Sequence, residues 1–346
     1  MRIEALTFYR FIAAIVVVTH HFGNKLVSLD YANQMVTFFF VLSGFVMTIA
    51  YYSKEEFATN SYVIHRISRI VPVYLVALAL TIYFRSASTV SAIILNLTFL
   101  QAWFPPYPLS VNFPAWSLSV EMFFYLSFPF ILANIKKIPS SQFMLVAAIS
   151  WGLTQAVLMN LLNGPFYTGF PSRSHDLIFY FPLSHFCSFL LGMGAASMFL
   201  QKKEQWRITT LYSLLFISAI FILIISDYQL EEMISSMTGS DFKFGGSFYA
   251  PVFMALILIT ALSDNFFTKA LSFKFPVLLG EASYAIYILQ VPIYMLFNRW
   301  IVPLIPADRM EHFVLYLLFL TAISILSFYW IEQPGKRVVH RLLSRT

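Results

Sequence analysis

An arginine and a histidine stand eleven residues apart in the first apolar stretch of the chain, at Arg10 and His21. Eleven residues make about three turns of an α-helix, so both side chains would lie on nearly one face, roughly 16 Å apart along the axis. Ionisable side chains are costly inside apolar segments and are therefore functional candidates. Arginine binds anions and histidine can act as a general base, so the pair suggests anion binding at one end of a helix and proton transfer at the other.

A carboxylate lies at a similar depth to the histidine in another apolar stretch. Glu121 falls inside the outer end of the stretch 115–133, and His21 falls near the outer end of its own. A carboxylate beside a histidine orients the ring for general-base catalysis. We therefore predict an outer layer in which His21 and Glu121 form the catalytic pair. His20 faces another side of the helix, and geometry alone does not exclude it.

Two further arginines, Arg66 and Arg69, open the third apolar stretch at a depth similar to that of Arg10. Guanidinium groups bind phosphate oxygens through paired hydrogen bonds. We predict that Arg10, Arg66 and Arg69 form an inner, phosphate-binding layer. The alternative for Arg66 and Arg69 is that they only fix the helix end at the cytoplasmic surface, with their charged heads reaching toward water.

Two other ionisable side chains are interpreted as structural. We expect His185 to be a neutral, hydrogen-bonded core histidine and Glu281 to be a structural carboxylate near a cytoplasmic helix end. The single Cys187 excludes an intramolecular disulfide and leaves nothing for a thiolate metal site, so no metal is expected.

The elements that must position these residues are membrane-spanning helices. Of 346 residues, 59% are hydrophobic and 11% are charged, whereas soluble domains are roughly 25% charged. The many Phe, Tyr and Trp residues suit aromatic belts at the two membrane surfaces. We predict an all-α, polytopic transmembrane helical bundle in one domain over residues 1–346. The apolar stretches are 4–22, 34–53, 62–84, 88–103, 115–133, 141–162, 179–200, 209–226, 248–263, 275–298 and 312–331.

Basic residues between and after these stretches indicate the orientation. They are Lys54, Lys136, Lys137, Lys202, Lys203, Arg207, Lys269, Lys274, Lys336, Arg337, His340, Arg341 and Arg345. Cytoplasmic loops are enriched in Lys and Arg, so we place these residues and both termini in the cytoplasm and read the net charge of +6 as a topology signal, not a nucleic-acid footprint. The stretch 88–103 then cannot be a simple crossing. We expect ten crossings plus one re-entrant or interfacial segment, and no cleavable signal peptide, because Arg10 interrupts the first stretch.

Several short motifs, in a fixed order along nearly the whole chain, resemble the membrane-bound acyltransferase family 3 of bacterial and other O-acyltransferases. The first is the arginine, ten residues and histidine from Arg10 to His21. The others are Phe38–Phe45, similar to Phe-Phe-x-x-Ser-Gly-Phe and containing Ser43 and Gly44; His65–Pro72, with its paired arginines; Pro114–Glu121, similar to Trp-Ser-Leu-x-x-Glu; and two weaker segments, Gly280–Tyr284 and Ile331–Pro334. One position departs from the family: many members carry a histidine where this chain has Gln290.

The resemblance implies transfer of an acyl group, most often acetyl, from acyl-CoA to a hydroxyl of a glycan or another extracytoplasmic acceptor. The phosphates of CoA would bind the three arginines, and His21 would take the proton of the attacking hydroxyl with Glu121 beside it. Ser43 and Gly44 would line the path or donate to the oxyanion, although close packing by small residues explains them equally well. No tightly bound cofactor is expected. The partners would be the bilayer of the plasma (inner) membrane and a glycan or lipid-linked sugar, with no nucleic acid.

Two other classes of function stay open. A transporter or flippase could bury the same Arg, His and Glu residues as a relay, but such proteins often show internal repeats and none is visible here. A structural or sensor subunit leaves the inner arginine layer unexplained. Since the chain stops after its basic tail, we expect a form without the fused soluble domain of some family members. The acceptor, the acyl chain and the oligomeric state do not follow from the sequence.

Overall fold

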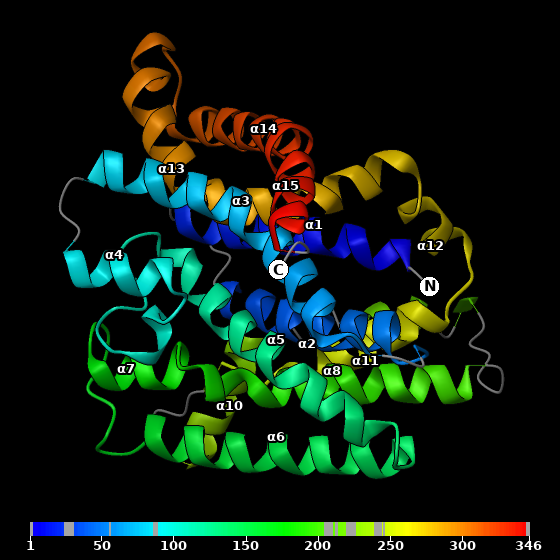
Figure 1. Ribbon diagram of the computed structural model, residues 1–346. Helices are drawn as coiled ribbons and strands as arrows, with labels where there is room; N and C mark the ends of the chain where they lie inside the picture. The colour runs from blue at the N-terminus through cyan, green and yellow to red at the C-terminus, as the bar shows by residue number, and fades with distance from the viewer. Residues whose placement is uncertain are drawn as a thin grey trace. The chain divides into compact units, whose positions relative to one another are not determined.

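The computed structural model describes residues 3–23, 31–54, 57–85, 89–203, 210–211, 214–218, 226–238, 244 and 246–343. Across these ranges every regular element is a helix, which confirms the predicted all-α class (Figure 1). Arg207 and Arg345, which entered the prediction of orientation, lie outside the described residues, and the cytoplasmic placement of both termini stays a prediction.

Eight helical stretches within the described ranges are long and apolar enough to cross a membrane. They are Glu4–Phe22 (α1), Ala32–Tyr51 (α2), Thr59–Arg85 (α3), Phe113–Ile135 with α5 (Trp116–Ile135), Ser140–Leu162 (α6), Arg173–Lys202 with α7 (Arg173–Phe179) and α8 (Pro182–Lys202), Lys274–Leu304 with α13 (Lys274–Trp300), and Arg309–Val339 with α14 (Arg309–Ser327). Each corresponds to one predicted apolar stretch, and the chain is a multi-pass membrane protein.

The remaining three apolar stretches behave differently. Within 88–103, α4 covers only Val90–Leu97, and a 3-10 turn follows at Gln101–Trp103. A helix of this length rises about 12 Å, whereas the hydrocarbon core is roughly 30 Å thick, so α4 is too short to cross it. In 248–263, α11 spans Ala250–Leu262 and is shorter than the roughly 20 residues of a standard crossing. The stretch 209–226 lies mostly outside the described residues, so the total of ten crossings stays a prediction.

The chain divides into two compact units whose segments alternate along the sequence. Unit 1 comprises Met1–Leu6, Val36–Glu55 and Ser127–Leu271, and unit 2 comprises Thr7–Met35, Glu56–Leu126 and Ser272–Thr346. The single functional domain predicted over residues 1–346 stays a prediction.

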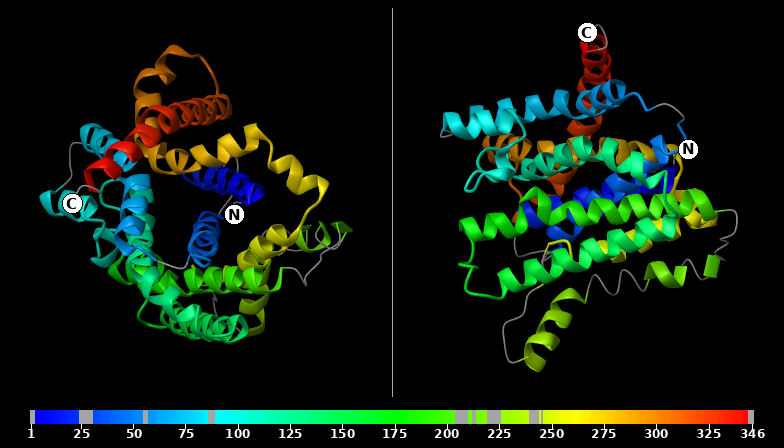
Figure 2. Two further views of the ribbon diagram at one scale, coloured as in Figure 1. Left: turned by 45° about the vertical axis from the view of Figure 1, so that its right-hand side comes forward. Right: turned by 60° about the horizontal axis from the view of Figure 1, so that its bottom comes forward.

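Unit 1 is organised around α8, which packs against α6 and α11 (Figure 2). Two glycines lie where α8 meets α2. A Cβ atom at Gly44 would overlap the carbonyl oxygen of Phe189, and one at Gly192 would overlap that of Val41. Small residues allow helix backbones in membranes to approach this closely. Gly44 therefore has a packing role, which was one of the two interpretations of Ser43 and Gly44 made from the sequence.

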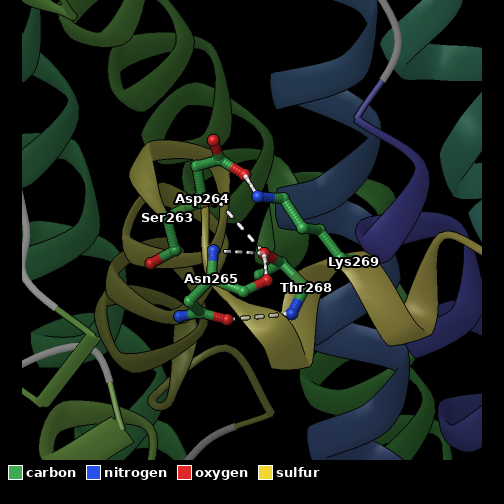
Figure 3. A network of polar contacts seen from close by, with 5 residues as sticks. All are labelled: Ser263, Asp264, Asn265, Thr268 and Lys269. Carbon is green, nitrogen blue, oxygen red and sulfur yellow. Dashed lines mark hydrogen bonds and ion pairs between the residues drawn. The ribbon is translucent and has the colours of Figure 1, made fainter.

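A compact polar turn ends α11 and begins α12 (Phe266–Leu271) in unit 1 (Figure 3). The N–H of Thr268 donates to Oδ1 of Asn265 at 2.9 Å, and the N–H of Asn265 donates to Oγ1 of Thr268 at 3.1 Å. This reciprocal arrangement satisfies backbone donors that a helix start leaves without partners. Lys269 and Asp264 form an ion pair of 3.1 Å beside it, and because both are exposed the pair contributes little to stability.

Unit 2 holds His21, Glu121 and the three arginines predicted to bind phosphate. In it α13 packs against α3 and α14, and α15 (Gln333–Leu343) packs against α3. A π-helical turn at Phe328–Glu332 joins α14 to α15. Gly335 of α15 lies so close to Pro72 of α3 that a Cβ atom would be 2.5 Å from the proline ring. The C-terminal part of the described chain is therefore packed into unit 2.

Candidate active site

His21 lies in the last turn of α1, within unit 2. Its Nδ1 atom is 2.7 Å from Oε1 of Gln290 on α13. Its ring meets the ring of Phe113 nearly at a right angle, with centroids 4.7 Å apart. A neutral amide and an aromatic ring therefore hold the imidazole in place. No second hydrogen bond to the ring comes from the residues that the structure describes, and the His21 side chain is partly exposed.

In the described structure Glu121 is hydrogen-bonded to Tyr125 and not to His21, so the predicted pair is not formed here, and the catalytic role of Glu121 stays a prediction. The carboxylate oxygen Oε2 of Glu121 accepts a hydrogen bond of 3.1 Å from the hydroxyl of Tyr125, one helical turn away. Phe113, which precedes α5, already packs against the ring of His21. The eight residues from Phe113 to Glu121 rise about 12 Å, which carries Glu121 along α5 away from the imidazole.

Glu121 lies instead with the arginines. The charges of Arg69, Arg10 and Arg66 all act on its carboxylate. The guanidinium of Arg66 also lies over the rings of Tyr62 and Tyr125, with its carbon 5.8 Å and 5.9 Å from their centroids. Guanidinium groups stack favourably on aromatic faces. The three arginines predicted as an inner layer thus all lie within electrostatic range of one carboxylate in unit 2.

Two more carboxylates belong to the same charged region. Glu281 and Glu332 act on the guanidinium of Arg10, as Arg69 and Glu121 do. Glu332 is buried to 2% exposure at the π-helical turn, and its Oε1 accepts a hydrogen bond of 2.9 Å from Lys336. Glu281, interpreted as structural from the sequence, therefore takes part in the electrostatics around Arg10.

Two prolines inside helices free backbone carbonyls that accept hydrogen bonds near His21 and near Glu121. Proline has no N–H, so it leaves the carbonyl four residues before it without its helical partner. Pro292 frees the carbonyl of Ile288, which accepts from Nδ2 of Asn112 at 2.9 Å. Pro129 in the same way frees the carbonyl of Tyr125, which accepts from the hydroxyl of Tyr62 at 3.0 Å. A buried carbonyl without a partner is costly, so these bonds tie the two proline-containing helices to their neighbours.

The remaining candidates lie in unit 1. His185 is 3% exposed, with Nδ1 3.1 Å from Oγ of Ser247 and Nε2 2.9 Å from the carbonyl oxygen of Phe179. Both ring nitrogens are occupied, which confirms a hydrogen-bonded core histidine. The hydroxyl of Ser43 donates to the sulfur of Met47 at 3.6 Å, and its role in the reaction stays a prediction.

The sequence did not assign a role to Gln290, Phe113 or Tyr125. Gln290 stands out in the sequence only as a departure from the family motif. The residues around it do not predict a contact with α1. Phe113 precedes the predicted stretch 115–133 and is not ionisable, so no charge pattern identifies it. Tyr125 stands four residues after Glu121, a spacing that places side chains on one helical face. That spacing alone could have identified the Tyr125–Glu121 pair.

The chain matches the family described as the acyltransferase domain over residues 3–332. It is 26% identical to the peptidoglycan O-acetyltransferase OatA of Listeria monocytogenes, across 95% of this chain and 55% of that protein. It is 27% identical to the acyltransferase MdmB of Streptomyces mycarofaciens, across 84% of this chain and 78% of that one. The putative peptidoglycan O-acetyltransferase YrhL of Bacillus subtilis is 26% identical, across 99% of this chain and 56% of its own length.

The chain spans little more than half the length of OatA and YrhL. No solved structure matches it significantly. The family match nevertheless covers nearly the whole chain and includes every residue of unit 2 discussed above, apart from Gly335 and Lys336 beyond its end. The protein therefore belongs to the acyltransferase-domain family, as its motifs indicate.

Proposed function

We propose that this protein is a membrane O-acyltransferase that moves an acyl group, most often acetyl, from acyl-CoA to a hydroxyl of a glycan or another extracytoplasmic acceptor. The observation that carries the proposal is the separation of two chemistries on one helix. Arg10 and the arginines around Glu121 suit the phosphates of CoA. His21, in the last turn of the same helix, has one ring nitrogen without a hydrogen-bond partner among the described residues.

The reaction follows from these two regions. The phosphates of CoA bind Arg10, Arg66 and Arg69, and the long flexible arm of CoA extends the thioester toward His21. The acceptor hydroxyl loses its proton to Nε2 while its oxygen attacks the thioester carbonyl. The tetrahedral intermediate expels the thiolate of CoA, an ester forms, and the imidazolium returns a proton to the thiolate. The negative end of the α1 dipole stabilises the imidazolium during the reaction.

Glu121 has a different role from the one that the sequence suggested. In its ionised form the carboxylate of Glu121 balances the three arginine charges that act on it when no donor is bound, and it limits their affinity for phosphate. A limited affinity lets the product CoA leave. The acceptor is proposed by class alone, because OatA and YrhL are named for peptidoglycan and this chain covers only part of each.

A vesicle experiment tests the proposed function against a carrier. The purified protein is placed in lipid vesicles that contain muropeptides or short oligosaccharides, and radiolabelled acetyl-CoA is added outside. We expect label to become covalently attached to the enclosed glycan, which is recovered and analysed by mass spectrometry. Unmodified acetyl-CoA inside the vesicles would instead indicate a carrier. If the label stays in the external acetyl-CoA whichever acceptor is enclosed, the proposal is contradicted.

We further propose a plasma-membrane location with both termini cytoplasmic. Reporter fusions in a bacterial host test it: fusions after Lys137 and Lys203 should report the cytoplasm, and those after Pro106 and Gly164 the exterior. An external signal at Lys203 would contradict the orientation.

A further inference from the structure

We propose that Gln290 is a positioning residue that fixes His21 with its proton on Nδ1 and leaves Nε2 as the basic nitrogen. The inference deepens the proposed function and rests on it for the role of His21 in acyl transfer. It concerns a residue for which neither the motifs nor the related proteins supply a role.

The amide of Gln290 can face His21 in only one way. Its Nε2 lies 2.6 Å from the carbonyl oxygen of Tyr287. Only the NH₂ group can lie there, because the reversed amide would bring two acceptor oxygens to hydrogen-bond distance without a proton between them. The oxygen Oε1 is consequently the atom turned toward His21, at 2.7 Å from Nδ1.

This orientation decides the tautomer of the imidazole. An amide oxygen only accepts hydrogen bonds, so Nδ1 of His21 must donate. A neutral imidazole carries one proton, so Nε2 then holds a lone pair. Nε2 has no hydrogen-bond partner in the part of the chain that the structure describes. The nitrogen left open to the acceptor hydroxyl is therefore the one able to take its proton.

Gln290 is itself rigidly held. It is 0% exposed, and its backbone carbonyl accepts a hydrogen bond of 2.8 Å from the hydroxyl of Tyr316. The turn of α13 around it is joined to the segment before α5 by two bonds: Asn112 to the carbonyl of Ile288, and the hydroxyl of Tyr287 to the carbonyl of Pro114 at 3.1 Å.

The same segment carries Phe113, whose ring packs edge to face against the imidazole. One braced unit of α13 and residues 112–114 thus sets both the hydrogen bond and the ring orientation of His21. A neutral amide achieves this without the desolvation cost of an additional buried charge.

Three variants of similar side-chain volume separate positioning from packing. Gln290→Met removes the acceptor, and we expect kcat for acetyl transfer to fall about 10- to 100-fold with little change in KM for acetyl-CoA. Gln290→Glu retains an oxygen acceptor, and we expect its kcat to exceed that of Gln290→Met. A purely structural role predicts the opposite order, because a buried carboxyl costs more than a thioether. Gln155→Met is the matched control, since Gln155 is buried in unit 1 without a hydrogen-bond partner among the described residues; it should keep the parent's kcat.

Nitrogen NMR of isotope-labelled histidine in lipid nanodiscs reads the tautomer directly. The His21 signals are assigned by their loss in His21→Gln. We expect Nδ1 protonated and Nε2 unprotonated in the parent protein, and loss of this preference in Gln290→Met. A protonated Nε2 in the parent, or an unchanged kcat in Gln290→Met, would overturn the inference. Absence of any acetyl transfer by the parent would overturn the proposed function instead, while the NMR result would still decide the tautomer.

Discussion

The two ends of α1 are surrounded by opposite kinds of side chain. At the His21 end the imidazole lies against the amide of Gln290, the ring of Phe113 and the ring of the adjacent His20. At the Arg10 end the guanidinium is acted on by Arg69 and by the carboxylates Glu281, Glu332 and Glu121. The His21 end is suited to proton transfer, and the Arg10 end is suited to a highly charged ligand.

Proton transfer and donor binding are therefore kept apart along one helix. A carboxylate next to His21 would have been a strong counter-ion for the imidazolium, and the sequence suggested one. The structure assigns that carboxylate to the arginines and gives the histidine an amide. The separation predicts that substitutions at the two ends change different kinetic constants.

The largest expected effect is on the rate, at His21. His21→Ala removes the base, so we expect acetyl transfer to fall about 100- to 10,000-fold, with donor binding unchanged. Single-turnover transfer and equilibrium binding of radiolabelled acetyl-CoA measure the two quantities. His20→Ala is the matched control and should keep most activity, because position 20 is turned about 100° from position 21. A dead His20→Ala with an active His21→Ala would reverse the assignment.

The next effect is on donor binding, at Arg66 and Arg69. Replacing either with Ala removes a charge-assisted contact to phosphate, so we expect the Kd for acetyl-CoA to rise about 10- to 100-fold. Lys should restore only part of the affinity, because an ammonium group lacks the paired donors of a guanidinium. If both alanine variants bind acetyl-CoA like the parent, the donor site lies elsewhere.

A smaller effect, in the opposite direction, is expected at Glu121. Glu121→Gln keeps the shape and the bond with Tyr125 but removes a negative charge from among the arginines. The phosphates of acetyl-CoA are then no longer repelled by a negative charge at position 121. The Kd for acetyl-CoA should therefore fall about three- to tenfold, and CoA should be released more slowly. The maximal rate of the chemical step should stay within about twofold of the parent. A large loss in that step would restore the catalytic role predicted from the sequence.

Substitutions in unit 1 are expected to change the stability of the protein and to leave the transfer reaction unchanged. Gly192→Ala forces a Cβ atom against the carbonyl oxygen of Val41, so we expect a loss of about 1–3 kcal/mol in the free energy of unfolding. Transfer per folded molecule should not change. Gly152→Ala on α6 is the control, because no atom lies within 4 Å of its new Cβ; it should be neutral or stabilise by about 0.5–1 kcal/mol. Equal stability of the two variants, measured by thermal unfolding, would contradict the close approach of α2 and α8.

The sequence predicted the helices well and the site only in part. Eight apolar stretches became long helices because hydrophobic length alone determines them. The gathering of Arg10, Arg66 and Arg69 followed from their common depth. The partner of His21 could not be predicted in this way. It depends on where the segment before α5 meets α1 and on which turn of α13 faces these two elements. Those are long-range contacts set by packing around Pro292 and Asn112, and no local pattern encodes them.

The most direct test of the separation along α1 is a double-mutant cycle of His21→Ala and Arg69→Ala, with the Kd for acetyl-CoA and the single-turnover transfer rate measured on the same samples. The account predicts that His21→Ala changes only the rate of transfer, that Arg69→Ala changes chiefly the Kd, and that the two effects are independent within about 0.5 kcal/mol. A His21→Ala variant that transfers acetyl at the parent's rate, or that loses donor affinity as fully as Arg69→Ala, would contradict it.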